Sequence, residues 1–232
     1  MNEQLEFRDL GVIEYGEAWK LQENLLTQNT SLKIRVAKGE DVAKTIHYLL
    51  FCEHPAVYTL GKSGKQEHVS KEELAKRNIG YYATNRGGDI TFHGPGQVVG
   101  YPIIDLERFF TDIGKYLRYL EEVIILTLAH YGIEGARSQA ETGVWIDPEI
   151  KIKARKICAM GVRCSRWVTM HGFALNVNTD LDYFNSIVPC GIPDKQVTSL
   201  QKELGREVDM REVKALLMSN FEKVFGCTLV NR

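Results

Sequence analysis

The chain is organised around one stretch, Arg86-Gly87-Gly88-Asp89-Ile90-Thr91-Phe92-His93-Gly94-Pro95-Gly96-Gln97-Val98-Val99-Gly100-Tyr101. Five glycines, a proline and a histidine fall within its sixteen positions. Glycine loses more conformational entropy on folding than any other residue, so this density needs a structural reason. Branched and aromatic residues between the glycines can anchor the segment in a core. The stretch therefore predicts either a glycine-rich hairpin corner or a backbone that lies close against a ligand.

Length and composition restrict the class of protein. A chain of 232 residues suits one domain, or one domain with a small appendage. Its 44% hydrophobic and 25% charged residues are ordinary for a soluble globular protein. A formal net charge of -1 gives no broad electrostatic case for nucleic acid or an anionic membrane as partner. No apolar run approaches the ~20 residues that span a bilayer.

The cysteines argue for a reducing compartment. There are five, Cys52, Cys158, Cys164, Cys190 and Cys227, at scattered spacings and without a CxxC pair. Zinc-ribbon and thioredoxin-type sites therefore lack support, and free thiols in a cytoplasmic protein are expected. The first residues show neither a basic region nor an apolar region of a signal peptide.

Hydrophobic periodicity predicts short strands interspersed with a few helices. The expected helices cover residues 17–28, 70–77, 112–131 and 208–225, with Gly132 and Gly226 as C-terminal stops. The expected strands are a short run over 12–15, then 45–53, 56–60, one opening at 81–82, 100–106, 143–146, 156–163 and 168–177. Pro102 favours an edge position or a strand start. This mixture predicts an α+β fold with a mixed, largely antiparallel sheet flanked by helices.

A phosphate-binding loop is suggested by Gly61-Lys62-Ser63 but is rejected. The P-loop pattern needs another glycine five residues before Gly61, and Ala56 stands there. Residues 61–65 are therefore interpreted as a polar loop that can contact substrate.

Cys190 is the strongest candidate for a nucleophile. It lies between Pro189 and Gly191, in an expected loop, and exposure is what a reactive thiolate requires. The alternative is a buried, inert cysteine, which is a common fate of free thiols. Cys158 and Cys164 flank an apolar strand, and their surroundings favour structural roles.

Lys156 and two histidines are candidates for acid–base chemistry. Lys156 precedes an apolar strand, where a lysine can act as a base or favour the charged form of a neighbouring thiol. The alternative is a solvated lysine at a strand start. His93 lies inside the glycine-rich stretch and His171 precedes Gly172, so either can move a proton or simply hold a loop.

The glycine-rich stretch resembles the signature of the octanoyltransferases of lipoate biosynthesis, the lipoyl(octanoyl) transferase family. Three further segments are similar to that family: Lys156-Ile157-Cys158-Ala159-Met160-Gly161, His171-Gly172-Phe173-Ala174-Leu175-Asn176-Val177-Asn178 and Pro189-Cys190-Gly191. Residues 61–68 also fit. The resemblance covers about residues 45–200.

The resemblance implies the biotin/lipoate protein ligase catalytic fold and a transfer of octanoyl to protein. Cys190 and Lys156 would form a catalytic dyad, with Cys190 carrying the acyl group as a thioester, and His171 a possible supporting residue. The residues that would bind substrate are Arg86, Gly87, Gly88, Asp89, Ile90, Thr91, Phe92, His93, Ala159, Met160, Gly161, Gly172, Phe173 and Ala174.

The same resemblance implies the partners. Octanoyl-acyl carrier protein would be the donor, and lipoyl domains of 2-oxoacid dehydrogenases and the glycine cleavage H protein would be the acceptors. No metal and no organic cofactor is expected, because a thioester donor arrives already activated. We expect one domain over residues 1–232, in which residues 1–44 form a strand and a helix packed on a catalytic region of about 45–232.

Two alternatives stay open at the level of sequence. An ATP-dependent lipoate or octanoate ligase on the same fold would form an acyl-adenylate and need no cysteine. A non-catalytic module that binds a carrier protein would be expected to lack Cys190 or Lys156, and both are present.

Overall fold

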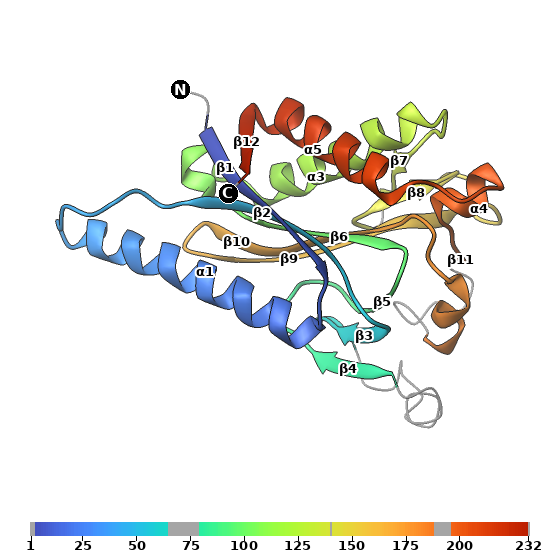
Figure 1. The fold of residues 1–232 in the computed structure, drawn as a ribbon, viewed down its shortest axis with the longest axis horizontal. Helices are drawn as coiled ribbons and strands as arrows, with labels where there is room; N and C mark the ends of the chain where they lie inside the picture. Colours follow the sequence, from blue (N-terminus) through green and yellow to red (C-terminus); the bar gives the residue numbers. More distant parts are fainter. Residues whose placement is uncertain (1–2, 65–78, 140, 188–195, 232) are drawn as a thin grey trace.

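A long mixed sheet forms the centre of the protein (Figure 1). The computed structural model describes residues 3–64, 79–139, 141–187 and 196–231. The strand order of the main sheet is β12-β1-β2-β6-β10-β9-β8-β7, and β11 pairs with β9. Its strands are β1 (Glu3–Val12), β2 (His47–Glu53), β6 (Gln97–Ile103), β7 (Ala136–Arg137), β8 (Val144–Ile146), β9 (Arg155–Ser165), β10 (Val168–Asn176), β11 (Gln196–Val197) and β12 (Cys227–Asn231).

Antiparallel pairing dominates this sheet, from β2 through β6, β10, β9 and β8 to β7. Parallel pairs join β1 to β12 and to β2, and β11 to β9. A second, small sheet has the order β4-β3-β5, with β3 (Val57–Leu60), β4 (Gly80–Ala83) and β5 (Ile90–His93). The predicted α+β class with a mixed, largely antiparallel sheet is confirmed.

Helices cover both faces of the main sheet. They are α1 (Tyr15–Ala37), α3 (Ile113–His130), α4 (Leu200–Leu204) and α5 (Met210–Phe225), with short 3-10 helices η2 (Leu106–Arg108) and η3 (Leu181–Ser186). Helices α3 and α5 lie on one face and α1 on the other, and the small sheet lies beside the first turns of α1 (Figure 1).

Strand β2 shows how the two faces are filled. Leu49 and Phe51 pack in the core beneath α3 and α5, while Tyr48, Leu50 and Cys52 pack in the core beneath α1. Successive side chains of a strand point to opposite faces, so a strand that is apolar throughout must be covered on both sides.

The two predicted helices 112–131 and 208–225 are confirmed to within two residues as α3 and α5. Gly132 and Gly226 follow their last turns with φ of +72° and +62°, the left-handed conformation that glycine adopts without strain. Asp112 caps α3, because its side chain accepts a hydrogen bond from the backbone N–H of Lys115 at 2.9 Å.

Helix α1 begins earlier and ends later than the predicted 17–28. Tyr15 was expected in a strand, which is wrong, because β1 ends at Val12 and Tyr15 opens the helix. The buried residues of α1 recur at helical spacing from Tyr15 to Asn29. The side-chain amide of Asn29 then bonds both backbone groups of Ile46, at 2.7 and 2.9 Å, which fixes the entry to β2.

The edge position expected for Pro102 is also wrong, because β6 lies between β2 and β10. Pairing with β10 runs from Gln97 to Gly100 and resumes at Asp105, so the missing N–H of Pro102 lies in an interruption of that ladder. The expected helix 70–77 lies outside the described residues, and the arrangement as one domain stays a prediction. Within the ranges described, no helix is both long and apolar enough to cross a bilayer.

We predict that Gly172→Ala destabilises the fold. A Cβ at this position would overlap the carbonyl oxygen of Gly100 on the neighbouring strand and lie 2.7 Å from Pro102 Cδ. Overpacking of this kind costs about 1–3 kcal/mol, measurable as a lower urea midpoint. Gly80→Ala is the matched control, because its added methyl would meet Val57 Cγ2 at an ordinary 3.4 Å. Equal midpoints for the two variants would contradict the prediction.

Candidate functional site

A cavity of about 500 Å³ lies where the main sheet, the small sheet and the first turn of α1 meet. It is lined by Lys156, His171 and thirteen of the fourteen predicted substrate-binding residues. The fourteenth, Phe92, is buried in the core of the small sheet, where its ring stacks on Tyr183 at 4.5 Å. Three segments that are far apart in sequence thus line one cavity, and their binding role stays a prediction.

Small residues on β9 and β10 make room for the glycine-rich loop. Gly161 is paired across the strands with Gly172, and Ala159 with Ala174. The loop lies directly against this bare patch, because Gly87 N–H donates to the carbonyl of Val162 at 3.0 Å. A Cβ on Gly161 would come within 2.5 Å of Gly87 O, so this close approach requires glycine.

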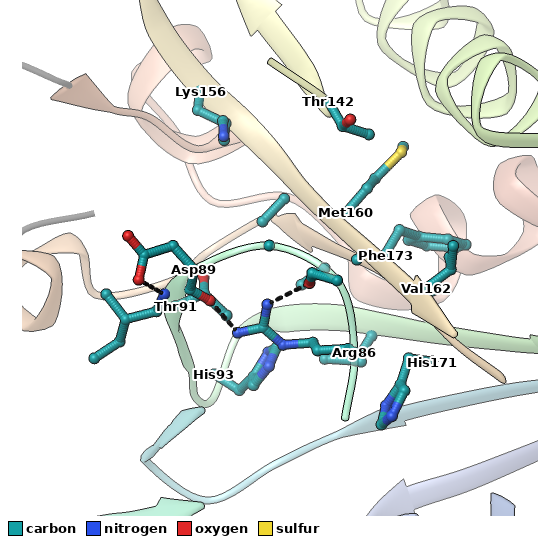
Figure 2. Close-up of a pocket in the computed structure, with 18 of the residues that line it drawn as sticks. Arg86, Asp89, Thr91, His93, Thr142, Lys156, Met160, Val162, His171 and Phe173 are labelled. Atoms are coloured by element: carbon teal, nitrogen blue, oxygen red, sulfur yellow. Dashed lines mark hydrogen bonds between the residues drawn. The ribbon is translucent and has the colours of Figure 1, made fainter. Parts of the chain in front are cut away.

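Arg86 ties the loop to the small sheet. Its Nη2 donates to the carbonyl of Thr59 at 2.6 Å, to Thr59 Oγ1 at 3.0 Å and to the carbonyl of Asp89 at 2.8 Å. Its Nη1 donates to the carbonyl of Gly87 at 3.1 Å. Burial lowers the pKa of Arg86, but a guanidinium starts so high that it stays a cation. Figure 2 shows the guanidinium between His93 and the loop it holds.

A chain of buried hydrogen bonds continues from Arg86 to β11. Thr59 Oγ1 lies 3.3 Å from His93 Nε2, and His93 Nδ1 lies 2.8 Å from Gln97 Oε1. Gln97 Nε2 donates to Asn176 Oδ1 at 2.9 Å, and Asn176 Nδ2 donates to the carbonyl of Thr198 at 3.0 Å. Since Gln97 Oε1 can only accept, the proton of His93 is on Nδ1. Burial holds the pKa of His93 well below its usual range, so the ring is neutral.

His171 has an unusual backbone for a residue within a strand, with φ of +57°. Its backbone N–H donates to Gln22 Oε1 at 2.9 Å and its Nε2 lies 2.7 Å from Asn85 Oδ1, so two neighbours hold it in this strained conformation. Burial, followed by the charges of Arg86 and Arg163, lowers the pKa of His171 to about 3. The structure therefore makes His171 a neutral cavity residue and not a proton donor near neutral pH.

A β-bulge brings Lys156 to the cavity side of the sheet. Val144 pairs with Cys158 and the next residue, Trp145, pairs with Lys156, so Ile157 is an extra residue on β9. Cys158 and Val144 pack in the core under α3. Trp145 and Lys156 therefore face the opposite side of the sheet, where Lys156 lines the cavity and its Nζ lies 4.6 Å from the Trp145 ring centroid.

Cys190 lies outside the described residues, so its pairing with Lys156 stays a prediction. The four cysteines that are described fit structural roles. Burial raises the pKa of Cys52 and Cys158 and raises that of Cys227 to about 12, so these thiols stay protonated near neutral pH. Cys164 is half-buried, and burial raises its pKa as well.

Several cavity residues were not expected from sequence. They are Tyr15, Gln97, Val99, Tyr101, Ile113, Leu117, Glu141, Thr142, Val162, Asn176, Phe184 and Val197. Alternation along a strand is a signal that would find some of them, since Gln97, Val99 and Tyr101 share one face of β6. Glu141 and Thr142 carried no such signal. In the part of the chain that the structure describes, no three His, Cys, Asp or Glu side chains converge as a metal site.

Comparisons with known proteins agree with the resemblance. Residues 14–222 match the family model described as the lipoyl protein ligase A/B catalytic domain. The chain is 56% identical over 232 residues to an octanoyltransferase of Christiangramia forsetii, with 99% of each protein covered.

Solved structures share the fold at low sequence identity. The bi-partite lipoate protein ligase of Thermoplasma acidophilum has a TM-score of 0.68 at 16% identity, covering 98% of this chain and 87% of that one. The biotin protein ligase of Aquifex aeolicus has a TM-score of 0.54 at 13% identity, covering 95% and 70%. The expected biotin/lipoate protein ligase-like fold is confirmed.

We predict that acid destabilises the protein through its buried neutral histidines. Burial lowers the pKa of His54 and His93, that of His47 to about 4 and that of His171 to about 3. As pH falls below about 6.5, the unfolded chain binds protons at these sites and the folded chain does not. Each histidine then lowers the free energy of unfolding by up to ~1.4 kcal/mol per pH unit.

Urea titrations at pH 7, 6 and 5 test this dependence. His171→Asn should reduce the slope of unfolding free energy against pH. A stability that is constant from pH 7 to 5 would show that these histidines are not neutral in the folded state.

Proposed function

The chain belongs to the family of lipoyl protein ligase A/B catalytic domains, and we propose that it is an octanoyltransferase. It moves octanoyl from octanoyl-acyl carrier protein to the side-chain amine of a lysine on lipoyl domains. The observation that carries the proposal is the near full-length similarity to an octanoyltransferase. The acceptors would be 2-oxoacid dehydrogenases and the glycine cleavage H protein, and the reaction would take place in the cytoplasm.

The reaction proceeds through an acyl-enzyme on Cys190. The Cys190 thiolate attacks the octanoyl carbonyl, the bond to the phosphopantetheine sulfur breaks, and the Lys156 ammonium protonates the departing thiolate. The acceptor amine then attacks the Cys190 thioester and gives its proton to Lys156. Cys190 leaves as a thiolate and the amide is complete. Lys156 lines the same cavity as the predicted acyl-binding residues, which supports a role for it in both steps.

The apolar part of the cavity suits an eight-carbon chain. Met160 and Phe173 from the sheet, and Ile113 and Leu117 from the start of α3, line it. Burying one methylene contributes ~0.8 kcal/mol, so about six methylenes contribute roughly 5 kcal/mol to acyl binding. This energy can hold the acyl group while the carrier protein departs.

Backbone N–H groups around the carbonyl would stabilise the oxyanion, each by ~3 kcal/mol. The glycine-rich loop and residues 159–161 are the candidates for these donors. Gly87 is excluded as an oxyanion donor, because its N–H already donates to Val162 O at 3.0 Å.

Arg86 argues against the ligase alternative. A ligase must bind the phosphates of ATP, a task that favours an arginine with its donors free. Here Nη2 donates to three protein oxygens and Nη1 to a fourth, so two of the three guanidinium nitrogens hold the loop, while the buried Nε has no partner among the described residues. A loop held in this way suits an acyl group better than a nucleotide.

We predict that Cys190→Ala lowers octanoyl transfer by several orders of magnitude, because the nucleophile is lost. The variant should also lack the octanoyl adduct that the wild-type protein forms with octanoyl-acyl carrier protein, as seen by intact-protein mass spectrometry. Cys164→Ala is the matched control and should transfer normally, since Cys164 does not line the cavity. Normal turnover by Cys190→Ala would contradict the acyl-enzyme route.

We also predict that transfer needs neither ATP nor magnesium, because the donor thioester is already activated. The purified protein should modify a lipoyl domain with octanoyl-acyl carrier protein alone and should leave free octanoate unused. A requirement for ATP with free octanoate would identify a ligase instead.

A further inference from the structure

Lys156 touches two groups that stabilise its positive charge. Its Nζ lies 3.2 Å from Glu141 Oε2 and 4.6 Å from the Trp145 ring centroid. The Lys156 and Glu141 side chains are only 22% and 19% exposed, so solvent screens their attraction weakly. Trp145 is buried and is paired with Lys156 across β8 and β9. An aromatic face and a carboxylate both favour an ammonium over a neutral amine.

The backbone close to Glu141 is hydrogen-bonded to α3. Two residues later, the backbone N–H of Gly143 donates to Oε1 of the fully buried Glu121 at 3.0 Å. Gly143 has φ of +117°, and a Cβ there would lie 2.5 Å from Cys158 O. Gly143 is therefore held between α3 and β9, two residues after Glu141.

Glu141 is the carboxylate in direct contact with Lys156. Among the described residues, the other charged and titratable groups around Lys156 are Cys158 on β9, Arg155 at the start of β9 with its partners Asp147 and Glu203, Glu121 with Arg118 and Arg137 near Gly143, and Asp89 across the cavity. Arg155 bonds both Glu203 and Asp147, at 2.6 Å each, so those charges offset one another. Strand β11 contributes uncharged Gln196 and Val197.

We propose that Glu141 is a positioning residue that keeps Lys156 as an ammonium ion and fixes it over the Trp145 ring. The catalytic consequence rests on the proposed function. An ammonium at this position holds Cys190 as a thiolate and has a proton ready for the departing phosphopantetheine sulfur. Loss of the carboxylate leaves a half-buried cation without its anion, which shifts Lys156 toward the neutral amine.

Glu141→Gln tests the charge of Lys156 without any substrate, because glutamine keeps the shape and removes the charge. Reductive methylation with formaldehyde and cyanoborohydride modifies only neutral amines, and peptide mass spectrometry reports Lys156 separately from the exposed Lys151. At pH 8 we expect Lys156 to react about tenfold faster in Glu141→Gln than in the wild type, because the carboxylate no longer disfavours the neutral amine. Lys151 should react equally in both.

Two further variants separate this effect from general disturbance. Glu122→Gln removes a neighbouring carboxylate that pairs with Arg137 and does not line the cavity, so Lys156 should react as in the wild type. Glu141→Asp keeps the charge and should restore most of the protection. In transfer assays, Glu141→Gln should lower kcat about tenfold with KM for octanoyl-acyl carrier protein nearly unchanged, and Glu141→Asp should recover part of it.

Unchanged methylation of Lys156 in Glu141→Gln would overturn the proposal, even if transfer were slower, because Glu141 would then act on something other than Lys156. Faster methylation in both glutamine variants would also overturn it. A wild-type protein without any octanoyl transfer would refute the proposed function, while the methylation rates would still decide whether Glu141 controls the charge of Lys156.

Discussion

A buried cation surrounded by neutral oxygens is the interaction on which the cavity depends. A charge removed from water is costly unless polar groups replace its hydration. Arg86 receives that replacement from three backbone carbonyls and one hydroxyl, contributed by β3 and by the loop that follows Arg86 itself. The requirement of one side chain thus dictates the path of the backbone around it. This charge joins the small sheet to the glycine-rich loop, together with backbone hydrogen bonds such as the one from Lys62 N–H to Arg86 O at 3.0 Å.

The titratable groups divide the cavity into two chemically different ends (Figure 2). Near Arg86, burial keeps His93 and His171 neutral and raises the pKa of Tyr15 to about 12. These three rings therefore stay uncharged near neutral pH. At the other end, Lys156 and Glu141 carry opposite charges at 3.2 Å. The ion pair therefore lies at one end of the cavity and the neutral rings at the other.

Local sequence patterns were sufficient to predict structural features that depend on a single segment of the chain. Helices α3 and α5 followed from their periodicity and closing glycines, and the resemblance located the three segments that line the cavity. Features that depend on contact between two segments were either missed or wrongly predicted. Pro102 is tolerated in an inner strand because the pairing with β10 is interrupted around it, and Tyr15 starts a helix because that helix packs on the sheet. Glu141 belongs to no motif, since its contact with Lys156 joins positions 15 residues apart in the chain.

The bulge at Ile157 has a consequence for how β9 can vary in length. The two parts of the strand are held by different neighbours, Lys156 by β8 and β11, and the residues from Cys158 onward by β10. Ile157 is the extra residue between these two parts. Its deletion would restore ordinary alternation of side chains and leave Lys156 lining the cavity, but it would remove the buried Ile157 side chain from the core. A residue lost between Cys158 and Gly161 would instead turn either the thiol or the glycine to the wrong face. The strand therefore has one position that can absorb a deletion, directly beside a stretch that cannot.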